Sequence, residues 1–132
     1  MKNLLGPWSP QILSILRIVT GLVLLHHGTS KFLGFPVSQY TGISPFTMVG
    51  AAGVLELVGG ALLVIGLFTR WAAFVLSGMC AFIYFSVNAP RGFFPFLNGG
   101  ELAIMFCFAL LYMAAAGGGP WSVDRLIRGT AD

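Results

Sequence analysis

The sequence predicts an all-α protein, a bundle of four transmembrane helices with both termini in the cytoplasm. Three observations support this fold class. The chain of 132 residues is 57% hydrophobic and only 8% charged, with a mean hydropathy of +0.89, which is too little charge to cover the surface of a soluble domain. Four apolar segments are each about as long as a membrane-spanning helix. Finally, Lys and Arg are unevenly divided between the two sets of loops.

The predicted spans cover residues 11–32, 46–68, 71–87 and 99–116. Pro10 and Pro45 precede the first two spans, where a missing backbone donor costs little. Only Thr69 and Arg70 separate the second span from the third, so these two helices are expected to be antiparallel neighbours. Three glycines and Pro120 end the fourth span. The length leaves no room for a second domain, so residues 1–132 are predicted to form a single membrane domain.

The orientation follows from the basic residues, which are enriched in the cytoplasmic loops of membrane proteins. The side that holds both termini carries the larger set, which is Lys2, Arg70, Arg125 and Arg128, with Arg17 inclined toward it. The other side carries Lys31 and Arg91. This bias predicts cytoplasmic termini in a multi-pass membrane protein.

Ionisable residues inside the spans need an explanation, because a charge at the membrane centre costs roughly 2.5–3.5 kcal/mol on insertion scales. Glu56 lies about ten residues into the second span, or roughly 15 Å deep. Small residues share its helical face, so that face is expected to contact another helix. An isolated carboxylate there would be neutral, and an ionised one needs a cation.

Arg17 is the cation that the sequence offers most directly. It begins a stripe of the first span that continues through Gly21 and Gly28 to Lys31. We therefore predict a buried ion pair between Arg17 and Glu56 that holds the first two helices together. In the alternative, Arg17 extends to the cytoplasmic headgroups. For Glu56, a structural pair competes with a catalytic or proton-carrying role.

A second group of polar residues is predicted to ring the outer mouth of the bundle: His27, Lys31, Asn88, Asn98 and Glu101. One stripe of the fourth span joins Glu101 to three large apolar or aromatic residues, Met105, Phe108 and Tyr112. This pattern predicts a pocket for an amphipathic ligand with a polar head, such as a quinone or another lipid. The alternative for Glu101 is a favourable position in the first turn of a helix.

The sequence argues against a metal site, because the adjacent His26 and His27 diverge on a helix and no pair of ligands is spaced i,i+4. Cys80 and Cys107 lack CxxC spacing and are predicted to be small core side chains. A disulfide between them stays open, because it depends on whether their helices are neighbours.

The sequence also resembles a known family. The stretches "LRIVTGLVLLHHGTSKFLGF", "GVLELVGGALLVIGLFTRWAA" and "LNGGELAIMFCFALLYMAAAGGGPWSVD", in this order, are similar to the DoxX family of small bacterial membrane proteins. The resemblance runs from about Arg17 to Asp124 and implies the same four-span topology and a place in the bacterial inner (plasma) membrane. One departure is Asn88, where relatives often carry a histidine before Ala-Pro. If that histidine contributes to a site in relatives, the chemistry here is altered.

The resemblance implies a role beside redox proteins, since some relatives are named in thiosulfate oxidation by quinone and others as membrane partners of redox-defence proteins. We predict a non-catalytic subunit or partner of a membrane redox system, with a partner redox protein or a homo-oligomer and with quinone as the candidate cofactor. A stand-alone enzyme is disfavoured, because the chain lacks CxxC, a haem attachment motif and a dinucleotide fingerprint. The alternatives are a small-solute or proton-linked carrier and a structural scaffold. The scattered basic residues give no sign of nucleic-acid binding.

Overall fold

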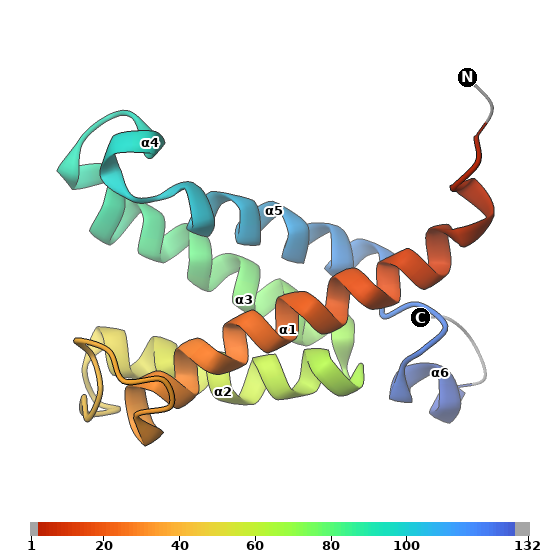
Figure 1. Cartoon of the computed structure of the whole chain (residues 1–132), viewed down its shortest axis with the longest axis horizontal. Helices are drawn as coiled ribbons and strands as arrows, with labels where there is room; N and C mark the ends of the chain where they lie inside the picture. Colours follow the sequence, from red (N-terminus) through yellow and green to blue (C-terminus); the bar gives the residue numbers. More distant parts are fainter. Residues whose placement is uncertain (1–2, 129–132) are drawn as a thin grey trace.

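The computed structural model describes residues 3–128 and is helical throughout its regular structure (Figure 1). The long helices are α1 (Ser9–Leu33), α2 (Met48–Ile65), α3 (Thr69–Ile83) and α5 (Glu101–Ala116). The short ones are η1 (Gly6–Trp8), the π-helical η2 (Tyr84–Asn88), η3 (Ala89–Arg91), α4 (Pro95–Asn98) and α6 (Val123–Arg128). No strand occurs between residues 3 and 128, and the predicted all-α class is confirmed.

Three helical segments are long and apolar enough to cross a membrane: Gly6–Leu33, Met48–Ile65 and Thr69–Arg91. They correspond to the first three predicted spans, and η2 carries the third one past the end of α3 to Asn88. The fourth predicted span corresponds to α5, which is apolar but has only 16 residues. Length and composition thus identify a membrane protein with three candidate spans and one shorter apolar helix.

Two glycines and a threonine set the limits of α2 and the end of α1. The Thr47 hydroxyl accepts a hydrogen bond from the Gly50 N–H at 3.0 Å and so caps the first turn of α2. Gly34 and Gly66 end α1 and α2 in the left-handed conformation, with φ of 67° and 76°.

The four long helices are arranged as two pairs: α1 packs along α2, and α3 packs along α5 (Figure 1). Glycines make the first pair close. A Cβ on Gly21 would lie 3.0 Å from the Gly60 carbonyl oxygen, and one on Gly60 would lie 2.8 Å from the Leu25 nitrogen. A Cβ on Gly28 would lie 2.8 Å from the Leu57 nitrogen. Small residues therefore let the two backbones touch, as in other membrane helix pairs.

The two ends of the bundle differ. One end, which we call the terminal end, holds the α2–α3 turn (residues 66–68), the segment 117–128 after α5, and η1 at the start of α1 (Figure 1). The other, the loop end, holds the connections 34–47 and 89–100, which include α4. The apolar core between them contains Leu24, Leu63, Ala73, Leu76, Leu110 and Met113.

Candidate functional site

Glu56 forms an ion pair with Lys31. The Lys31 Nζ donates a hydrogen bond to Glu56 Oε1, and the residues are 8% and 5% exposed. His27 lies one turn before Lys31 on α1, and its Nδ1 is 4.0 Å from Glu56 Oε2. Three ionisable side chains from α1 and α2 thus lie close together.

The predicted pair between Arg17 and Glu56 does not form. Arg17 is fully buried and binds main-chain carbonyls at the terminal end. Its Nε donates to Leu63 O at 2.8 Å, its Nη2 donates to Trp121 O at 2.6 Å, and its Nη1 donates to Gly118 O. The alternative prediction, extension to the headgroups, also fails, because the side chain is enclosed.

The antiparallel register of α1 and α2 explains this correction. Gly21 lies against Gly60, and Gly28 lies against Leu57. Glu56 is therefore level with the turn of α1 that holds His27 and Lys31. Arg17, about one turn before Gly21, is level with the end of α2. Depth estimated from helix ends placed the two charges too close together, because α1 begins about two turns before the level at which α2 ends and so extends beyond α2 at the terminal end.

A cavity of about 200 Å³ adjoins the ion pair. All four long helices contribute to its wall. The ionisable part comes from α1, through His27 and Lys31, and from α2, through Glu56. The remaining wall is largely apolar and consists of Leu24, Met79, Cys80, Ile83, Gly99, Leu102, Ala103 and Phe106. The cavity thus combines a few polar groups with an apolar lining, which is the usual character of small-molecule sites.

A second hollow, of about 300 Å³, lies on the other side of His27 and Lys31 under the 34–47 connection. Besides His27 and Lys31, the polar residues Ser38, Gln39 and Tyr40 line it. Ser30 also lines it; this residue is buried, and its Oγ has no hydrogen-bond partner among the described residues. His27 and Lys31 therefore line both this hollow at the loop end and the cavity beside Glu56.

The connection over this second hollow is fixed to the end of α1 by hydrogen bonds. Gly42 N donates to Lys31 O at 2.7 Å, and Thr41 Oγ1 donates to Ser30 O at 2.9 Å. Thr29 Oγ1 donates to Phe35 O at 2.6 Å. The first two bonds use carbonyls in the last turn of α1, so the end of the helix and the connection over the hollow are fixed to one another.

Asn88 and Asn98, both predicted pocket residues, lie close together, but their side chains form hydrogen bonds with main-chain groups. Asn88 Nδ2 donates to Asn98 O at 3.2 Å, and Asn98 Nδ2 donates to Gly92 O at 2.9 Å. Gly100 N donates to Asn98 Oδ1 at 2.8 Å. The two asparagines hold the α3–α5 connection in place, and Gly99 of that connection lines the cavity. They support the site without lining the cavity.

The stripe of α5 that was predicted to line the pocket faces outward. Glu101, Met105, Phe108 and Tyr112 are all exposed, and none of them lines the cavity. The inward face carries Ala103 and Phe106 beside the cavity and Leu110 in the core. Since α5 is apolar on every side, its sequence could not indicate which face turns inward. The aromatic stripe is therefore corrected to an exposed outer face of α5.

Two residues that sequence reasoning undervalued have clear places. Cys80, predicted as a small core residue, lines the cavity; it and Cys107 are free thiols. Asp124 caps α3 at the terminal end, where its carboxylate accepts from the Phe68 and Thr69 N–H groups at 2.8 and 2.9 Å. An aspartate after the Gly-Gly-Gly-Pro break was the available signal for such a cap. Within residues 3–128, no three His, Cys, Asp or Glu side chains are grouped to hold a metal ion.

Comparisons with known proteins agree with this membrane architecture. The model of the DoxX family matches residues 12–89. The chain belongs to the DoxX family. The DoxX match includes His27, Lys31 and Glu56, and it ends before α5.

Three relatives share most of the chain's length. An uncharacterized protein of Haemophilus influenzae is 44% identical over 128 residues, covering 93% of this chain and 96% of its own. An uncharacterized membrane protein of Mycobacterium tuberculosis is 30% identical, covering 93% and 85%. A Bacillus subtilis protein named "Putative oxidoreductase CatD" is 29% identical, covering 86% and 84%. No solved structure matches the chain.

Proposed function

We propose that this DoxX protein is a non-catalytic membrane subunit that holds a quinone or quinone-like lipid beside the Lys31–Glu56 pair. The observation that carries the proposal is the cavity of about 200 Å³ with a paired ammonium and carboxylate in an otherwise apolar wall. An apolar protein cavity of about 150 Å³ can hold one benzene ring. The space therefore suits a single ring that carries a few small substituents.

The polar groups of the wall suit the head of such a ligand in both of its oxidation states, the quinone and the quinol. The Lys31 ammonium has three N–H donors, and Glu56 uses one of them. Another can bind a ring carbonyl oxygen, which only accepts. A ring hydroxyl can donate to Glu56, whose second oxygen lies 4.0 Å from His27 Nδ1. Electron transfer would come from the quinone and a partner redox protein, and the chain's own residues would bind and orient the ring.

The wider assignment follows from the family and the helices. We infer a single membrane domain in the bacterial inner membrane, with α5 as a fourth span and both termini cytoplasmic. The packing of α5 along α3 supports the fourth span, since α3 belongs to a candidate span and the two helices share their depth. The name of the relative CatD, which includes the word oxidoreductase, supports a redox association.

Binding of a short-tailed benzoquinone to the purified protein in lipid nanodiscs, measured by native mass spectrometry, tests this function. The decisive variant is the double substitution Lys31→Met/Glu56→Leu, which removes both charges at once. Replacing a buried ion pair by apolar side chains is often neutral or stabilising, so this protein is expected to fold. It should bind the benzoquinone at least about tenfold more weakly than the wild type, because the polar partners of the ring are gone.

The matched control is Glu101→Gln, which removes a carboxylate at the start of α5 without touching the cavity. Its binding should equal that of the wild type. If the charge-free double variant folds and binds the benzoquinone as the wild type does, the pair only fixes helix packing. The scaffold interpretation would then replace the proposed function.

A further inference from the structure

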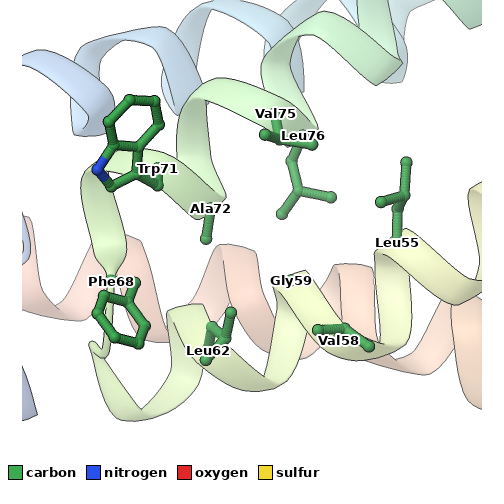
Figure 2. A pocket seen from close by; sticks show the side chains of 9 residues that line it. All are labelled: Leu55, Val58, Gly59, Leu62, Phe68, Trp71, Ala72, Val75 and Leu76. Atoms are coloured by element: carbon green, nitrogen blue, oxygen red, sulfur yellow. The ribbon is translucent and has the colours of Figure 1, made fainter.

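A long apolar groove runs between α2 and α3 on the outside of the bundle. Two hollows of about 430 and 330 Å³ form it, and they share Leu55 of α2 and Val75 of α3. Figure 2 shows the larger one: Leu55 and Leu76 point into the gap between the helices, and Phe68 and Trp71 lie at the α2–α3 turn. None of the residues that line either hollow is charged.

This groove meets the candidate site. Met79 and Ile83 line the smaller hollow on one side and the cavity beside Lys31 and Glu56 on the other. These two side chains are thus the partition between the groove and the cavity. Methionine is unbranched and adapts its shape readily, so Met79 is suited to a partition that opens for a flexible chain.

We propose that the α2–α3 groove binds the apolar tail of the same ligand whose ring lies beside Lys31 and Glu56. The inference rests on the proposed function and adds that the natural ligand is a long-tailed lipid rather than a tailless ring. A tail that passes between Met79 and Ile83 and ends near Trp71 would follow α3 for about 18 Å. Continuity with the polar site is what favours one ligand over an unrelated phospholipid or a helix of a second copy.

The tail contributes to selectivity more than to total affinity. A hydrocarbon chain in the bilayer is already surrounded by apolar groups, so entering the groove yields no hydrophobic gain. It gains closer dispersion contacts with the groove walls, and these are individually small. We therefore expect blocking of the groove to weaken binding of a long-tailed ligand several-fold, without abolishing it.

Gly78 offers a way to block the groove without disturbing the fold. It lines the smaller hollow, and no atom lies within 4 Å of the place where its Cβ would stand. Gly78→Leu fills open space on a helix surface and replaces glycine by a better helix former. Gly78→Ala is the matched control for helix propensity, and Val19→Phe adds bulk on an exposed face of α1 outside the groove.

The experiment compares a benzoquinone with a long isoprenoid tail and the same ring without a tail, each binding to the protein in nanodiscs. Gly78→Leu should weaken binding of the tailed compound about three- to tenfold and leave the tailless one unchanged. Gly78→Ala and Val19→Phe should leave both unchanged. This pattern would support the assignment of the groove to the tail.

Other outcomes separate the two proposals. If the wild type binds the ring with or without a tail equally and Gly78→Leu changes neither, the tail subsite is wrong and the proposed function stands. If Gly78→Leu weakens the binding of both compounds to the same degree, the tail subsite is also wrong, because the effect would then lie in the cavity. If the wild type binds neither compound, the proposed function is wrong and this inference falls with it. A copurified phospholipid that Gly78→Leu displaces, with quinone binding unchanged, assigns the groove to a different occupant.

Discussion

The terminal end and the loop end of this bundle both bury ionic groups, but they use them differently. At the terminal end, Arg17 donates to three carbonyls and Asp124 accepts from two N–H groups, all of the main chain. At the loop end, Lys31 and Glu56 bind one another and face a cavity of about 200 Å³. The pocket that adjoins Asp124 at the terminal end measures only about 40 Å³.

The difference shows how a buried charge in a membrane protein can be interpreted. Arg17 donates to the Leu63 carbonyl near the end of α2 and to two carbonyls of the segment after α5, so its guanidinium group serves to stabilise the fold. Lys31 and Glu56 bind one another through their side chains and adjoin the cavity. They also keep further donors and acceptors for a ligand. An intramembrane charge is a functional candidate by default, and the adjoining cavity decides between these cases.

The largest expected effect is that of Arg17→Met. The substitution leaves the carbonyls of Leu63, Gly118 and Trp121 buried without their donor. We expect the free energy of unfolding in micelles to fall by about 3–5 kcal/mol. Limited proteolysis should then cut within the segment 117–128, which Arg17 holds in place. The control is Arg125→Met, an exposed arginine on α6, whose effect should stay within about 0.5 kcal/mol. Equal effects of the two variants would remove the distinction between the ends.

The sequence predicted much of this fold but only part of the site. Long apolar helices and their glycine ends are local features, so the positions of α1, α2 and α3 followed directly from composition. Which residues meet across two helices depends on their register. The positions of Gly21, Gly28 and Gly60 set the register of α1 against α2. That placement brings Lys31 to Glu56 and takes Arg17 away.

The signal for the correct pair was present in the sequence. Lys31 belongs to the same stripe of α1 as Gly28, and the glycines of α2 flank Glu56. Matching the two small-residue stripes in antiparallel order would have selected Lys31. No comparable signal existed for α5, whose residues are apolar on every face, so its inward side is set by packing alone.

A double-mutant cycle gives an intermediate effect and tests the register directly. Lys31→Met and Glu56→Gln should couple by about 1–3 kcal/mol in the free energy of unfolding. The reason is that each single substitution leaves the remaining side chain of the pair without its partner. Arg17→Met combined with Glu56→Gln should be additive to within about 0.5 kcal/mol, since the two side chains share no partner. Coupling of Arg17 to Glu56, with additivity for Lys31, would restore the sequence-based pair and contradict the register described above.

Glu101→Gln should produce the smallest effect and sharpens the boundary of the loop-end site. Its carboxylate lies in the first turn of α5, exposed and outside the cavity wall, although its place in the sequence made it a candidate for the pocket. Loss of the charge removes only its favourable interaction with the helix N-terminus, about 0.3–1 kcal/mol at most. We expect an unfolding free energy within that margin and unchanged benzoquinone binding in nanodiscs. Weaker binding by this variant would mean that the ligand contacts the outer face of α5, and the ring would then lie in the lipid beside the bundle instead of next to Lys31 and Glu56.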